Sequence, residues 1–105
     1  VAIRNSLVEQ HPWLPKAVFD AYSKAKSLMY DHLKKMGWAT ISLPWAAQEI
    51  EETQALMGEN FWPYGIKPNR KALETLFRYS YEQGLASRKL TIEELFHPST
   101  LALEE

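Results

Sequence analysis

The side chains best suited to chemistry in this sequence are two aromatic residues, an amide and two arginines. Trp62 and Tyr64 lie in a turn rich in proline and glycine, and Asn69 and Arg70 follow at the start of a periodic helix. An aromatic turn beside an arginine at a helix N-terminus can face an anionic aromatic ligand. The guanidinium group of Arg4 can clamp a carboxylate through two hydrogen bonds. These five residues form the candidate substrate-binding set.

Each candidate also has a purely structural interpretation. Arg4 can be a surface arginine at the start of a helix. Trp62 and Tyr64 can pack the following helix against a neighbouring part of the protein, while Pro63 and Gly65 fix the turn. The sequence alone leaves both interpretations open.

A complete catalytic set does not accompany these residues. The imidazoles are those of His11, His32 and His97. His32 lies on the apolar stripe of a helix, as a hydrogen-bonded core histidine would, and the other two precede prolines at helix boundaries. No two histidines have the i, i+4 spacing of metal ligands, and the glutamates within 49–52 are too consecutive to converge on one ion. We therefore expect no metal and no cofactor, and the catalytic acid is unknown.

The composition bounds the class of protein. The chain has 105 residues, 46% of them hydrophobic, which is enough for one domain with a core. Its formal net charge is −1, so it lacks the basic excess of a nucleic-acid binder. No apolar run approaches the ~20 residues needed to span a bilayer, so no membrane partner is expected. Cysteine is absent, which excludes disulfides and thiol catalysis within this chain.

Hydrophobic periodicity and helix-end signals predict five helices and no convincing pair of strands. The helices are expected over residues 5–10, 13–36, 44–57, 68–83 and a short segment between Thr91 and Pro98. Ser6 with Glu9, and Thr91 with Glu94, have the spacing of a capping box. Ser42 is a candidate cap for the third helix, after a connector that can include a short extended segment. Glycine is expected just beyond three helix ends, at Gly37, Gly58 and Gly84.

The first residues differ from the rest. Val1-Ala2-Ile3 has the character of the tail of a β-strand, without a second strand to pair with. The chain opens without methionine or a signal peptide. We expect a piece of a longer protein, cut just inside a strand; a processed mature terminus is the alternative.

Several short motifs occur in a characteristic order along the chain. They are His11-Pro12-Trp13, Trp62-Pro63-Tyr64-Gly65, Asn69-Arg70, Tyr81-Glu82-Gln83-Gly84-Leu85 and Leu90-Thr91-Ile92-Glu93-Glu94-Leu95-Phe96. In order and spacing they resemble the C-terminal part of the 4,5-dihydroxyphthalate decarboxylase family, across essentially the whole chain. Each motif is short, and together they are fairly specific.

The resemblance implies a two-lobed α/β fold like that of periplasmic solute-binding proteins, in which residues 1–105 form one helical C-terminal domain. It implies removal of one carboxylate from 4,5-dihydroxyphthalate to give protocatechuate, in phthalate degradation, by a cytoplasmic enzyme able to form homo-oligomers. Arg4 would then follow a strand directly, where ligands of open α/β sheets bind. The partners of this segment would be the aromatic dicarboxylate and the missing N-terminal lobes, and the isolated segment would be inactive.

Two other functions stay open. A solute-binding protein of an ABC transporter has the same architecture without the enzymatic activity, because a fold does not determine a function. A signal peptide ahead of this segment would favour transport, and its absence would favour the enzyme. A free-standing helical interaction module would instead unfold cooperatively and lack a large exposed apolar patch.

Overall fold

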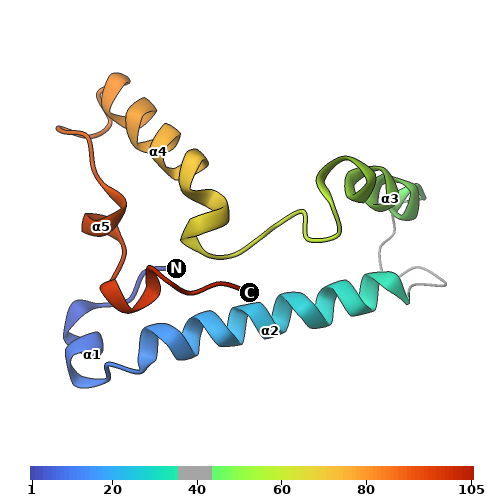
Figure 1. Cartoon of the computed structure of the whole chain (residues 1–105), viewed down its shortest axis with the longest axis horizontal. Helices are drawn as coiled ribbons and strands as arrows, with labels where there is room; N and C mark the ends of the chain where they lie inside the picture. Colours follow the sequence, from blue (N-terminus) through green and yellow to red (C-terminus); the bar gives the residue numbers. More distant parts are fainter. Residues whose placement is uncertain (36–43) are drawn as a thin grey trace. The chain divides into compact units, whose positions relative to one another are not determined.

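The computed structural model describes residues 1–35 and 44–105, which divide into two compact units. The first unit comprises residues 1–23 and 64–105, and the second comprises residues 24–63. The described residues are mainly helical and contain no strand, which confirms the mainly α prediction (Figure 1). The elements are α1 (Asn5–Gln10), α2 (Leu14–Lys34), α3 (Ala46–Met57), α4 (Ile66–Glu82), α5 (Ile92–Leu95) and the 3₁₀ turn η1 (Pro98–Thr100). A single domain over residues 1–105 stays a prediction.

No helix within the described ranges is long and apolar enough to cross a membrane. The first four residues carry no regular secondary structure, and Arg4 has an extended backbone. The predicted strand concerns a longer protein and stays a prediction.

The predicted capping box at the start of α1 is wrong. The helix begins two residues earlier than that box requires, with Arg4 at the N-cap and no side-chain cap. Ser6 therefore lies inside the first turn, where its hydroxyl cannot cap the helix. The backbone carbonyl of Arg4 accepts from the N–H groups of Leu7 and Val8 instead, at 3.0 and 3.2 Å.

Helices α2 and α3 keep their predicted places with shifted ends. Pro15 lies in the first turn of α2, where a proline removes no intrahelical hydrogen bond. Helix α3 begins at Ala46, two residues after the predicted start, and ends before Gly58 at a φ of 87°. The predicted end of α2 at Met36 and Gly37, the cap Ser42 and the connector over 38–43 lie outside the described residues.

Helix α4 begins two residues before the predicted start, at Ile66. Pro68 is therefore the third residue of the helix, where its missing N–H has no intrahelical acceptor to lose. The end of α4 is as predicted, because Gly84 follows it at a φ of 72°. The N–H groups of Gly84 and Leu85 donate to the carbonyls of Tyr81 and Ser80, at 3.0 and 2.9 Å, which is the Schellman pattern.

A small apolar core joins α4 to the C-terminal segment. Its buried members are Ile66 and Phe77 of α4 and Ile92 of α5. Four partly buried residues pack against them, namely Leu73, Leu90, Phe96 and Leu101. The Thr91–Glu94 capping box is present, so the prediction for the start of α5 is confirmed. This core joins α4 to α5 within the first unit.

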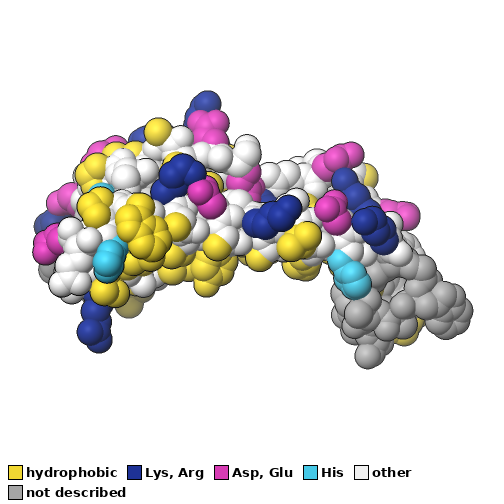
Figure 2. All heavy atoms as spheres, turned by 90° about the horizontal axis from the view of Figure 1, so that it is seen from below, with side chains coloured by type: hydrophobic (Ala, Val, Ile, Leu, Met, Phe, Trp, Pro, Cys, Tyr) yellow, Lys and Arg dark blue, Asp and Glu magenta, His cyan; other side chains and the backbone are white. Residues whose placement is uncertain are grey.

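The apolar stripe of α2 does not reach a core within the described part of the chain. Pro15 is the one buried residue of this helix, and Tyr22, Leu28 and Met29 are all exposed. His32 is exposed as well, which contradicts its interpretation as a core histidine. Large hydrophobic side chains lie open among charged ones on the face that Figure 2 presents. An apolar face of this width needs a partner to remove it from water.

Candidate functional site

The aromatic turn ends at Gly65, the N-cap residue of α4. Gly65 has a φ of 105° and a ψ of 162°, a conformation that only glycine adopts readily, and it offers no side-chain cap. Asn69 compensates from inside the helix, since its side-chain amide Nδ2 donates to the carbonyl of Gly65 at 2.9 Å. The amide of Asn69 therefore stabilises the turn.

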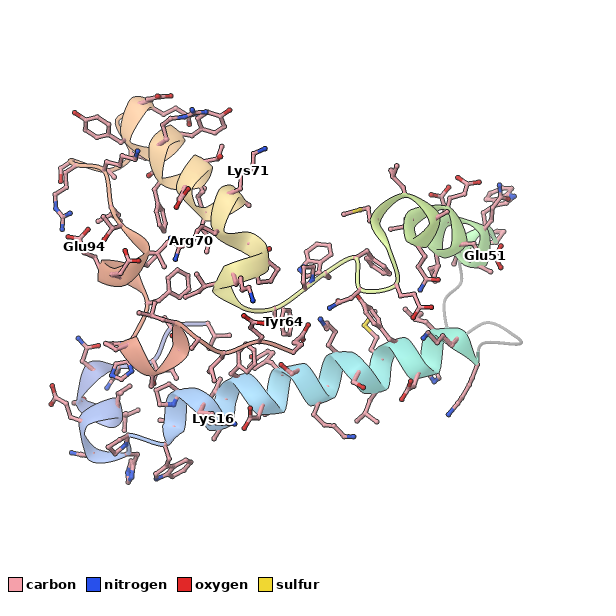
Figure 3. All side chains as sticks on the ribbon, viewed as in Figure 1. Lys16, Glu51, Tyr64, Arg70, Lys71 and Glu94 are labelled. Atoms are coloured by element: carbon pink, nitrogen blue, oxygen red, sulfur yellow. The ribbon has the colours of Figure 1, made fainter. Side chains whose placement is uncertain are left out.

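The C-terminal tail closes over the same turn. Gly65 and Glu104 form an isolated antiparallel bridge. The ammonium of Lys67 lies 3.0 Å from the Glu104 carboxylate, and the backbone N–H of Tyr64 donates to Glu105 Oε2 at 3.1 Å. Figure 3 shows Tyr64 at this junction of the tail with the segment leading into α4. The tail thus contacts the turn and the start of α4 through both backbone and side-chain groups.

Arg70 lies between two carboxylates of the same unit. Its Nη1 is 3.4 Å from Glu74 Oε1 on the next turn of α4, and its Nη2 is 3.9 Å from Glu93 Oε1 on α5. Figure 3 shows Arg70 on the side of α4 that faces α5. The guanidinium is about half exposed, so these pairs are partly screened by water. Arg70 therefore links α4 to α5 by electrostatic attraction.

Arg4 differs from Arg70 in its surroundings. It is exposed at the N-cap of α1, and only its backbone carbonyl is engaged. Within residues 1–35 and 44–105, its guanidinium takes part in no ion pair or hydrogen bond. All five of its N–H donors are thus available to a carboxylate.

Trp62 belongs to the second unit, whereas the other four candidates belong to the first. The residue is 69% exposed, and its backbone carbonyl accepts from Lys26 Nζ at 2.9 Å. Lys26 also donates to Asn60 Oδ1 at 3.0 Å, which holds the segment before the turn against α2. The ring of Phe61, the residue before Trp62, lies with its centroid 5.2 Å from that of the Tyr30 ring. The structure brings Tyr64, Asn69 and Arg70 together at the N-terminal end of α4.

The Glu94 carboxyl group has a displaced pKa. The pKa of Glu94 is lowered from 4.5, chiefly by the hydrogen bond from the backbone N–H of Thr91. The Thr91 hydroxyl and the Arg88 guanidinium contribute further, and Arg88 Nη1 lies 2.8 Å from Glu94 Oε1. These contacts belong to a helix cap and do not assemble a general acid.

The histidines have local contacts only. His97 caps η1, with its Nδ1 accepting from the Ser99 N–H at 3.3 Å. The ring of His11 lies 5.8 Å from that of Trp13 in a tilted arrangement. Over the described ranges, no three residues among His, Asp and Glu come together as a metal site would require. His11 and His97 thus lie at turns, as the prolines that follow them in the sequence predict.

The sequence reasoning missed an apolar groove in the second unit. The groove has a volume of about 470 Å³ and lies between the C-terminal half of α2 and the start of α3. Its lining is apolar with one exception, Glu49, and comprises Met29, Leu33, Pro44, Trp45, Ala46, Glu49, Ile50 and Phe61. The Pro44-Trp45 pair at a helix start was the available signal, since two adjacent apolar side chains there can line a groove.

Together these features define a helical segment with a small core, a glycine-dependent turn and large exposed apolar surfaces. No protein-family model matches the sequence. The chain is 34% identical over 101 residues to the 4,5-dihydroxyphthalate decarboxylase of Comamonas testosteroni. The match covers 96% of this chain and 31% of that relative, so the chain spans about a third of the relative's length. The resemblance that the motifs indicate is thereby confirmed.

Proposed function

We propose that this chain is the C-terminal part of a 4,5-dihydroxyphthalate decarboxylase, an enzyme that converts its substrate to protocatechuate and CO₂. The observation that carries the proposal is the 34% identity to a protein of that name over 96% of the chain. The order of the turn, cap and helix-end motifs along the chain agrees with it.

The parent protein would have a two-lobed fold like that of periplasmic solute-binding proteins, with this segment packed against the preceding lobes. The exposed apolar residues of α2 support such packing, since water-exposed stripes of this kind are costly in an isolated protein. By the same resemblance the parent would act in the cytoplasm and form homo-oligomers.

In the proposed reaction the bond between the ring and one carboxylate breaks, and CO₂ leaves. The bonding electron pair stays on the ring carbon, which takes a proton from an acid outside this segment. Arg4 is the proposed carboxylate ligand of this segment, because its guanidinium is exposed and its donors are available. Trp62 offers an exposed indole face to the aromatic ring. Tyr64, Asn69 and Arg70 would position the turn, and direct contact of these three with substrate stays a prediction.

The test is an assay of the full-length parent for CO₂ release from 4,5-dihydroxyphthalate, with protocatechuate identified as the aromatic product. Stoichiometric release of both products is the expected result. Tight binding of a different solute without turnover would overturn the proposal, and the isolated 105-residue chain serves as an inactive control.

A further inference from the structure

We propose that the groove of the second unit is a docking site for an apolar segment of the parent chain that precedes residue 1. This inference rests on the proposed function, because it takes this chain to be part of a longer protein. The groove is formed by α2 and the region from Pro44 to Phe61, all within residues 24–63.

The lining of the groove argues against the aromatic dicarboxylate as its occupant. A volume of about 470 Å³ lies within the range of small-molecule sites, roughly 300–1,000 Å³, so size does not decide the question. Its lining contains no lysine or arginine to balance a carboxylate, and its one charged member, Glu49, would repel an anion. Two lysines of α2 within this unit contact other groups: Lys26 donates to Asn60 and the Trp62 carbonyl, and Lys34 lies 3.6 Å from a Glu59 carboxylate oxygen.

The exposure of the groove residues favours an apolar protein segment. Met29 is 55% exposed and Trp45 is 69% exposed, although both line the groove. Covering side chains of this size removes apolar area worth ~25 cal/mol per Å² from water.

The length of the relative indicates that most of the parent chain lies outside this segment. This chain matches 31% of the relative, which leaves 100 − 31 = 69% of the relative's length outside the match. A segment of the same polypeptide is held close to the groove by covalent connection, so it has a high effective concentration there. A second copy of this chain lacks that advantage, and it is therefore one of the outcomes that the experiment separates.

Cysteine labelling in the parent tests the proposal. This chain contains no cysteine, so Met29→Cys reports on the groove and Asp31→Cys, two residues along the same helix and outside the lining, is its matched control. N-ethylmaleimide labelling of each site is followed by peptide mass spectrometry. In the parent, Met29→Cys is expected to react about tenfold or more slowly than Asp31→Cys, whereas in the 105-residue chain the two react at similar rates. Trp45→Cys and Glu51→Cys repeat the comparison on the α3 side.

Equal labelling of Met29→Cys and Asp31→Cys in a folded parent would overturn the docking proposal. So would slowing in the 105-residue chain that grows with its concentration, because that result identifies a second copy as the occupant. CO₂ release is measured on the same parent preparation. Activity without protection contradicts the docking alone, and protection without activity contradicts the decarboxylase assignment alone.

Discussion

Gly65 and Leu103 approach so closely that a Cβ atom on residue 65 would lie 2.7 Å from the Leu103 carbonyl oxygen. The contact joins the start of α4 to the C-terminal tail, and the adjacent Gly65–Glu104 bridge runs beside it. The aromatic turn that identifies this sequence is therefore shaped by a segment near the other end of the first unit. Its glycine is required both for its positive φ and for the space that the tail occupies.

Replacing this glycine should destabilise the first unit more than replacing a glycine that has only the unusual φ. Gly65→Ala is expected to lower the free energy of unfolding by about 2–4 kcal/mol, combining backbone strain with the clash. Gly84→Ala is the matched control, because it has a φ of 72° and nothing within 4 Å. It should cost only about 1–2 kcal/mol. Urea unfolding followed by circular dichroism measures both, and equal losses would show that the contact with the tail contributes nothing.

The small core between α4 and α5 should depend strongly on one aromatic residue. Phe77 is 6% exposed within the core, whereas its neighbour Leu76 is 59% exposed. Phe77→Ala should destabilise the chain by about 3 kcal/mol, because it removes buried apolar area and leaves a cavity. Leu76→Ala should change stability by about 0.5 kcal/mol or less. Thermal and urea unfolding compare them, and a Leu76→Ala loss as large as that of Phe77→Ala would contradict the observed core.

The capping box of α5 should make stability depend on pH. The pKa of Glu94 is lower in the folded chain than its ordinary value of 4.5, so folding favours its charged form. This contribution is fully present above the unfolded pKa and is lost as pH falls through the folded pKa. Between about pH 6 and pH 3, the wild-type chain should therefore lose more stability than Glu94→Gln, which does not titrate.

Thr91→Ala is the control for the cause of that dependence. It removes the hydroxyl but keeps the backbone N–H, which is the larger influence on the pKa of Glu94. Most of the pH dependence should thus survive in Thr91→Ala, although the cap itself weakens by ~1 kcal/mol. Unfolding free energies across this pH range provide the measurement. A Glu94→Gln curve parallel to that of the wild type would show that the cap does not stabilise the charged carboxylate.

The parts of the fold that the sequence predicts are those set by neighbours in the chain. The Thr91–Glu94 box spans four residues, and the Gly84 end of α4 uses contacts within six, so both were predicted correctly. The start of α4 was predicted too late, because its position depends on a tail beginning almost forty residues further on. The Ser6 box failed for a different reason, since the extended backbone of Arg4 lets the helix begin two residues earlier.

The candidate site shows the same division between near and distant partners. The sequence identified Trp62, Tyr64, Asn69 and Arg70 as a group, but it did not identify what they contact. Asn69 donates to Gly65, a partner that its i, i−4 spacing could have suggested. The pairing of Arg70 with Glu93 crosses from α4 to α5, which no local pattern reveals. The groove was missed because it joins residues from two helices and from the segment around Phe61.

Replacing Arg4 and replacing Arg70 should have different effects on the activity of the full-length parent. Arg4→Ala is expected to lower kcat/KM for 4,5-dihydroxyphthalate by about tenfold to a hundredfold, mainly through KM, because a charge-assisted contact to a carboxylate is lost. Arg70→Ala should change kcat/KM by about threefold or less, since Arg70 is paired with Glu74.

Arg78→Ala is the matched control for Arg70. It lies on the same helix with the same exposure and pairs with Glu82 at 3.8 Å in the same i, i+4 arrangement. Similar kinetics for Arg70→Ala and Arg78→Ala would assign Arg70 to the framework of α4 and α5. A loss in Arg70→Ala equal to that in Arg4→Ala, with Arg78→Ala unaffected, would instead place the guanidinium of Arg70 at the substrate. Unchanged KM in Arg4→Ala would contradict the carboxylate contact, because loss of a charge-assisted contact weakens substrate binding.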